Sequence, residues 1–133
     1  MALDIMIKKF HSRLTQKESL EIAGDDEVAV VSFLVPSLTN EDEIEACFNK
    51  LIVFIGRKKP SKLIIDFGQV RFFSSRVLGE LLKVKAKLDS FGGRVVISAI
   101  NPQLYRVFKV TSLDKIFSFY PDKESALKEL KIN

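Results

Sequence analysis

The stretch that decides the fold lies in the middle of the chain and reads Val70-Arg71-Phe72-Phe73-Ser74-Ser75-Arg76-Val77-Leu78-Gly79. It follows the apolar run 63–67, which is typical of a strand buried on both faces. It precedes apolar residues at helical spacing, which predict a helix. Two serines therefore stand at a helix N-terminus, where unpaired N–H groups and the helix dipole favour a negative group such as phosphate. We call residues 73–79 the serine corner.

Residues before the corner show two periodicities. Segments 3–9, 18–23 and 27–34 are predicted strands, and Gly24-Asp25-Asp26 has the chemistry of a hairpin turn between the second and third. Pro36-Ser37 ends the third strand. A helix is then expected from Thr39 or Asn40 to Gly56, because Asn40 and Glu43 have the spacing of a capping box.

The pattern of strand followed by helix continues after the corner. A helix over 77–88 is expected to stop at Gly92-Gly93, and a strand follows at 94–99. Asn101-Pro102 opens another helix, because asparagine caps helices and proline suits the first turn. A last strand at 116–119 leads to a helix capped by Pro121-Asp122. The order β-β-β-α-β-α-β-α-β-α predicts an α/β fold with a mixed, mostly parallel sheet and about four helices, in one domain over 1–133.

Composition limits the classes of partner. The chain of 133 residues has a net charge of +4, but its lysines are scattered and no nucleic-acid-reading motif accompanies them. Cys47 is the single cysteine, so an internal disulfide framework is excluded and a cytoplasmic location is expected. The sequence has no signal-peptide pattern and no apolar run near the roughly 20 residues that span a bilayer. We expect neither nucleic-acid nor membrane binding.

No constellation of catalytic residues emerges. Asp66 ends a predicted strand, but no second acid–base or nucleophilic group follows it, so we interpret it as a strand-end acid that bonds nearby backbone. His11 is the single histidine and cannot form a metal set with Cys47, which falls on a helix core face. A non-enzymatic protein without metal or cofactor is expected.

With these elements in order, residues 63–130 resemble the STAS domain of bacterial anti-sigma factor antagonists and related sulfate-transporter modules. The family pattern is an apolar strand ending in Asp, a hydrophobic pair, and Asp-Ser-Ser/Thr-Gly-Leu-Gly at a helix start. Here Asp66 ends the strand, Phe72-Phe73 is the pair, and residues 74–79 open the helix. Further matching segments are Gly92-Gly93-Arg94-Val95-Val96-Ile97, Ile100-Asn101-Pro102-Gln103-Leu104, Leu113-Asp114-Lys115-Ile116-Phe117 and Glu124-Ser125-Ala126-Leu127.

The resemblance implies a STAS-like fold and a function. The chain would bind an anti-sigma factor or a similar serine-kinase-like protein, and the kinase would phosphorylate the corner at the position of Ser75. Gly79 matches a glycine that lies beside the partner surface. The monomer or weak dimer would present a partner-binding surface of Pro36, Ser37, Phe73, Ser74, Ser75, Arg76, Leu78 and Gly79.

Three alternatives remain open from the residues themselves. Ser74 or Ser75 is interpreted equally well as a plain helix N-cap. The family's acid before the phosphorylated serine is replaced by Ser74, and Arg76 is added, which favours a constitutive interaction scaffold. A small-molecule or lipid-sensing domain, with its ligand at the strand ends, is the third. The phenylalanines are expected at core positions, with Phe73 the one that borders the surface.

Overall fold

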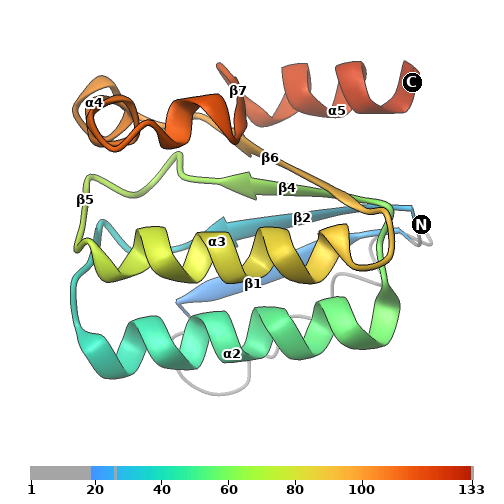
Figure 1. The fold of residues 1–133 in the computed structure, drawn as a ribbon, viewed down its shortest axis with the longest axis horizontal. Helices are drawn as coiled ribbons and strands as arrows, with labels where there is room; N and C mark the ends of the chain where they lie inside the picture. The colour runs from blue at the N-terminus through green and yellow to red at the C-terminus, as the bar shows by residue number, and fades with distance from the viewer. Residues whose placement is uncertain (1–18, 26, 133) are drawn as a thin grey trace.

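The computed structural model describes residues 19–25 and 27–132. Its centre is a five-stranded sheet in the order β1-β2-β4-β6-β7 (Figure 1). The strands are β1 (Leu20–Gly24), β2 (Val28–Phe33), β4 (Lys62–Asp66), β6 (Arg94–Ser98) and β7 (Ser118–Tyr120). β1 is antiparallel to β2, and the other pairs are parallel. The mixed, mostly parallel sheet is confirmed, whereas the strand predicted at 3–9 lies outside the described residues.

The turn between β1 and β2 depends on Gly24 and Asp25. The Asp25 carboxylate accepts hydrogen bonds from the N–H groups of Glu27 (2.9 Å) and Val28 (2.8 Å). The bond from Val28 contributes most to a pKa of Asp25 below its usual range. Gly24 has φ +127°, and a Cβ there would lie 2.3 Å from the Val28 carbonyl oxygen. The predicted hairpin therefore requires a glycine at its first turn position.

Helix α2 (Glu41–Lys58) begins as the sequence predicts. The Asn40 side chain accepts the N–H of Glu43 at 2.9 Å. The Glu43 carboxylate instead accepts a 2.5 Å hydrogen bond from the Ser19 hydroxyl, which ties the helix start to the residue before β1. The predicted end at Gly56 is wrong, because Lys59 adopts the left-handed conformation and closes the helix on the Ile55 carbonyl.

Helix α3 (Arg76–Asp89) lies beside α2 on one face of the sheet (Figure 1). Val77, Leu81 and Val84 are fully buried in the main core under these helices. Leu82 is 39% exposed, and Glu80 is buried. The buried face of α3 therefore includes one acidic side chain.

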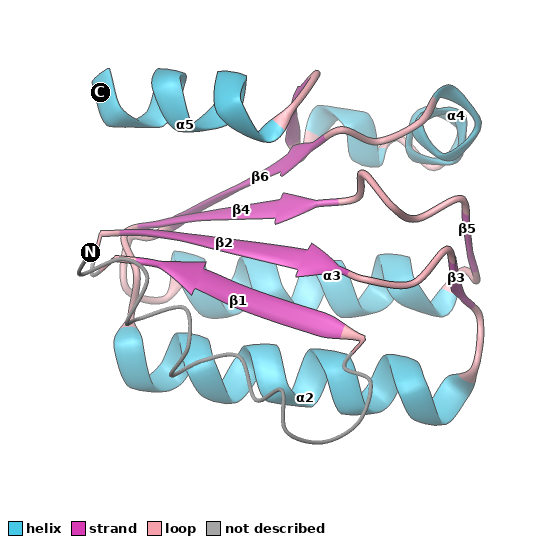
Figure 2. Ribbon diagram, turned by 180° about the vertical axis from the view of Figure 1, so that it is seen from behind, coloured by secondary structure: helices cyan, strands magenta, loops and turns pink. Residues whose placement is uncertain are grey.

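The remaining helices use the predicted caps. Asn101 accepts the N–H of Leu104 (2.9 Å) at the start of α4 (Pro102–Val110). Asp122 accepts the N–H of Ser125 (2.7 Å) before α5 (Lys123–Ile132), and a short 3₁₀ turn, η1 (Leu113–Lys115), follows α4. Helix α5 covers the sheet face opposite α2 and α3, where it buries a second apolar cluster: Val28, Ile64, Val96, Ala126 and Leu130. The central strands are thus buried on both faces (Figure 2).

Two short strands were not predicted. β3 (Ser37–Leu38) and β5 (Phe72–Phe73) form a separate two-stranded parallel sheet, in which Ser37 faces Phe72 and Leu38 faces Phe73. They lie beyond the carboxyl ends of β2 and β4, at the same end of the molecule as α4 (Figure 2). Strands of two residues carry no readable period, so the sequence pattern missed them.

Replacement by alanine should have unequal effects on stability at two glycines with positive φ, Gly24 and Gly92. Gly24→Ala should lower the free energy of unfolding by more than about 2 kcal/mol, because left-handed strain adds to the clash with Val28. Gly92→Ala is the control: Gly92 has φ +83°, and no described atom lies within 4 Å of its Cβ position, so strain alone acts and the loss should be about 1 kcal/mol. Urea unfolding measures both. Equal losses would contradict this account of the turn.

Candidate functional site

Backbone hydrogen bonds join the serine corner to the loop 36–40. The Pro36 carbonyl accepts the N–H groups of Arg71 (2.7 Å) and Phe72 (3.1 Å), and the Leu38 carbonyl accepts the N–H of Ser74 (3.0 Å). Because these hydrogen bonds join main-chain atoms, they fix the relative position of the two segments independently of the side-chain types. Pro36 and Ser37 are therefore brought beside the start of α3, as the expected partner surface requires.

Neither serine caps α3 with its side chain. Ser75 occupies the N-cap position, but its backbone is already helical (φ −61°, ψ −19°) and its side chain forms no capping bond. The first turn closes through the carbonyls of Ser74 and Ser75, which accept from Val77 (3.0 Å) and Leu78 (3.1 Å). Ser75 is therefore the N-cap residue, as one interpretation predicted, but the side-chain capping bond expected of an N-cap serine is absent. Ser75 is exposed, and its hydroxyl is not engaged by the helix.

The Ser74 hydroxyl has the opposite environment. Its Oγ is buried, and it has no hydrogen-bond partner among the residues that the structure describes. A buried hydroxyl without a partner has lost its hydration with no compensation. Ser74 therefore contributes polarity that the fold itself does not use.

Asp66 has a structural role in this structure. Its carboxylate accepts hydrogen bonds from the Ser98 hydroxyl (2.7 Å) and from the N–H of Gly68 (3.3 Å). These bonds hold the ends of β4 and β6 together and start the loop that leads to the corner. The interpretation of Asp66 as a strand-end acid is confirmed.

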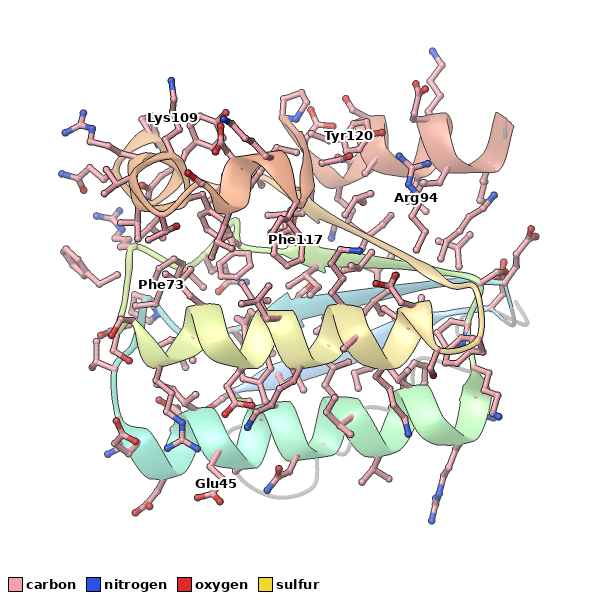
Figure 3. The ribbon with its side chains drawn as sticks, viewed as in Figure 1. Glu45, Phe73, Arg94, Lys109, Phe117 and Tyr120 are labelled. Carbon is pink, nitrogen blue, oxygen red and sulfur yellow. The ribbon has the colours of Figure 1, made fainter. Side chains whose placement is uncertain are left out.

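The two phenylalanines of β5 face opposite ways, as alternate residues of a strand do. Phe73 is half-buried and packs edge-to-face on Phe67 (5.8 Å between ring centroids) and Phe108 (6.1 Å), pointing inward in Figure 3. Phe72 is 59% exposed, so its expected core position is wrong. Leu78 is only 8% exposed and supports the corner from beneath. Phe72 is therefore an exposed aromatic residue next to the serine corner.

Arg76 links the starts of α2 and α3. Its Nη1 lies 2.5 Å from Glu41 Oε1, and its Nε lies 3.4 Å from Glu80 Oε2, which is also 3.6 Å from Lys83 Nζ. The hydrogen bond to Glu41 is the main cause of a pKa of Arg76 above its usual value. Arg76 is thus held by two carboxylates. Glu80 was missed, although its spacing four residues after Arg76 is the signal for such a pair.

Gly79 is exposed on the first turns of α3. No described atom lies within 4 Å of the position where a Cβ would stand. Glycine inside a helix is about 1 kcal/mol less favourable than alanine. Packing within the described residues therefore does not explain this glycine.

The structure describes residues 19–25 and 27–132. No group of three or more His, Cys, Asp or Glu side chains is placed to hold a metal ion there. Within the same ranges, no helix has the length and apolar character needed to cross a bilayer.

Comparison with known proteins identifies the family. The STAS domain model matches residues 8–126. The chain belongs to the STAS domain family. The anti-sigma F factor antagonist of Paenibacillus polymyxa is 26% identical over 78 residues, which cover 59% of this chain and 67% of that protein.

Solved STAS structures share the architecture. The anti-sigma factor antagonist SpoIIAA in its unphosphorylated form has a TM-score of 0.76 at 19% identity, covering 86% of this chain and 97% of that one. The phosphorylated form of the Bacillus protein has a TM-score of 0.67 at 20% identity, covering 84% and 98%. An anti-sigma factor antagonist from Mycobacterium paratuberculosis has a TM-score of 0.72 at 28% identity, covering 89% and 99%. The predicted STAS fold is confirmed.

Two serines of this region, Ser74 with a buried Oγ and the fully buried Ser98, should respond in opposite ways to replacement by alanine. Ser74→Ala should leave the free energy of unfolding unchanged or raise it by up to about 1 kcal/mol, because it removes an unpaired hydroxyl. Ser98→Ala should lower it by about 1–3 kcal/mol, because the Asp66 carboxylate loses its donor. Chemical denaturation of both variants and of the wild type measures these changes in the free energy of unfolding. A Ser74→Ala loss as large as that of Ser98→Ala would mean that the Ser74 hydroxyl is bonded in solution.

Proposed function

We propose that this STAS domain is an anti-sigma factor antagonist, a non-enzymatic cytoplasmic protein that binds an anti-sigma factor and so frees a sigma factor. The binding surface is the serine corner together with the loop 36–40. The names of the related proteins support this assignment. The observation that carries it is the exposed hydroxyl of Ser75, which no helix cap engages, on a platform fixed by backbone bonds.

The platform is suited to binding because it is already ordered. Its two segments are held by the bonds from Arg71, Phe72 and Ser74 to the loop 36–40, and Val77 and Leu78 pack beneath it. A surface that is ordered before binding loses less conformational entropy when the complex forms. The exposed glycine, Gly79, leaves room for close approach by the partner.

Phosphorylation of Ser75 would regulate this surface. A partner serine kinase would transfer the γ-phosphoryl group of ATP to the Ser75 oxygen, release ADP, and take up the hydroxyl proton; ATP and Mg²⁺ belong to that kinase. The product adds about −1.5 to −2 charge at pH 7. Glu41 and Asp42, in the first turn of α2, are acidic residues on the same side of the molecule. The modified surface would no longer complement the partner.

A constitutive interaction domain is the second candidate. Arg76 is held by Glu41 and Glu80, and Ser74 stands where the family has an acid, so the corner differs from that of the phosphorylated relatives. On this candidate, the surface binds its partner without any change at Ser75. Substitutions at Ser75 distinguish the two candidate functions.

Ser75→Asp should weaken binding of the cognate anti-sigma factor at least about tenfold, because a permanent negative charge lies in the contact. Ser75→Ala should bind like the wild type. Calorimetric titration against each anti-sigma factor of the source organism measures both, and mass spectrometry after incubation with kinase and ATP maps the phosphate. If the two variants bind alike and Ser75 stays unmodified, the constitutive candidate holds instead.

Gly79→Ala should weaken the same complex while the fold becomes more stable by up to about 1 kcal/mol, because alanine is the better helix former. Gly56→Ala on α2 is the matched control. Its Cβ would stand 3.6 Å from Lys87 Cε, an ordinary contact, so stability should rise without any change in affinity. Unfolding and titration are measured on each variant. Equal affinities of the two variants would remove Gly79 from the interface.

A further inference from the structure

The surface on the α4 side of the serine corner is basic and almost free of acids. The sequence has no Asp or Glu between residues 67 and 79, or between residues 90 and 113. Arg71, Arg106 and Lys109 are exposed within these segments. The acid at their border, Asp66, already accepts from Ser98 and Gly68. We call Arg71, Phe72, Gln103, Arg106 and Lys109 the basic flank.

The basic flank is one continuous surface. The Asn101 side chain donates to the carbonyls of Val70 (3.3 Å) and Arg71 (3.5 Å), which joins the loop before β5 to the start of α4. Gln103 and Arg106 are three residues apart on α4, and Arg106 and Lys109 again three apart. Residues at this spacing are neighbours on one helix face. The cations therefore extend outward from the corner along α4.

An apolar cleft lies inside this basic surface. It has a volume of about 450 Å³ and lies between the segments 67–72 and 99–103, with Phe72, Pro102 and Gln103 in its lining. The Phe72 ring is 59% exposed beside it. An exposed aromatic residue next to an arginine is the composition that protein interfaces favour at their anchor points.

Charge on the other side of the corner has the opposite sign. The first turns of α2 carry Glu41, Asp42 and Glu45, all of them exposed. Figure 3 shows Glu45 on α2 at one side, Lys109 on α4 at the other, and Phe73 between them. A partner that covers the corner thus meets an acidic and a basic half. Opposite charges across an interface orient the encounter and raise its rate.

We propose that the basic flank is a second contact area for the protein partner and takes an acidic segment whose apolar side chain enters the cleft beside Phe72. The charge favours an acidic protein segment, because Arg71, Arg106 and Lys109 form no ion pair within residues 19–25 and 27–132. Arg71 lines the cleft, and Arg106 and Lys109 follow Gln103, another lining residue, along α4. This inference rests on the proposed function, since it specifies the chemistry of the partner that docks at the serine corner.

The first test needs no identified partner. A capped five-residue peptide with leucine between two pairs of glutamates is titrated into the ¹⁵N-labelled full chain, and the amide shifts are recorded. Shifts should concentrate in residues 67–72 and 99–109 and should disappear in the double variant Arg71→Glu and Arg106→Glu. The same peptide with lysines in place of glutamates is the control. Shifts that are scattered over the surface, or equal for both peptides, would overturn the proposal.

The second test uses the anti-sigma factor that binds the wild type. Arg71→Glu with Arg106→Glu, and separately Phe72→Ser, should each weaken the complex at least about tenfold, and the double variant should reduce its salt dependence. Arg57→Glu with Arg94→Glu makes the same change in charge at exposed arginines away from the corner and should change affinity less than about twofold. Circular dichroism checks the fold of each variant.

The outcomes separate the two proposals. If flank variants bind like the wild type while Ser75→Asp binds weakly, the flank is wrong and the proposed function stands. If no anti-sigma factor binds the wild type, the proposed function fails, and the peptide titration alone decides whether the flank takes acidic segments. If control and flank variants lose affinity equally, only net charge matters and the flank proposal is overturned.

Discussion

The site depends on a few backbone hydrogen bonds between segments more than thirty residues apart in sequence. The Pro36 and Leu38 carbonyls hold Arg71, Phe72 and Ser74, and this pairing sets where α3 begins. Because these contacts are made by main-chain atoms, they do not depend on the exposed side chains of the two segments, whereas Leu38 and Phe73 pack into the core. The polar and aromatic residues exposed at the corner are a consequence of that arrangement.

The serine corner and the adjacent Phe72 contain features that the stability of the fold alone would not select. Gly79 lies inside a helix, where glycine is less stable than alanine, and Ser74 has a buried hydroxyl without a described partner. The ring of Phe72 is exposed, so it adds little hydrophobic stabilisation. Outside residues 73–79, the helix starts follow the usual capping preferences: Asn40, Asn101 and Asp122 each accept a backbone N–H of the helix that they precede. Local departures of this kind concentrate at functional sites, where stability is given up for recognition.

The structural features that have a local cause could be predicted from the sequence. The caps at Asn40 and Asn101, the hairpin at Gly24 and the buried strand β4 each follow from residue chemistry or period within a short window. What the sequence pattern missed depends on distant partners. β5, which pairs with β3, has Phe72 exposed and Phe73 half-buried, and Glu80 is buried beside Arg76, which also bonds Glu41 of α2. Likewise, Lys59 rather than Gly56 ends α2, because a non-glycine residue adopts the left-handed conformation there.

The ion pairs of Arg76 affect how a phosphate on Ser75 could be bound. An unpaired arginine next to Ser75 at the start of α3 would be a natural counter-charge for a phosphate on that serine. Here the Arg76 guanidinium already bonds Glu41 and Glu80, so a phosphate must compete with two carboxylates for it. The positive charge next to Ser75 is thereby balanced, and the uncompensated cations lie on the α4 side instead. The proposed docking on the basic flank therefore uses cations other than Arg76, whereas a phosphate on Ser75 would have to compete with an existing ion-pair network.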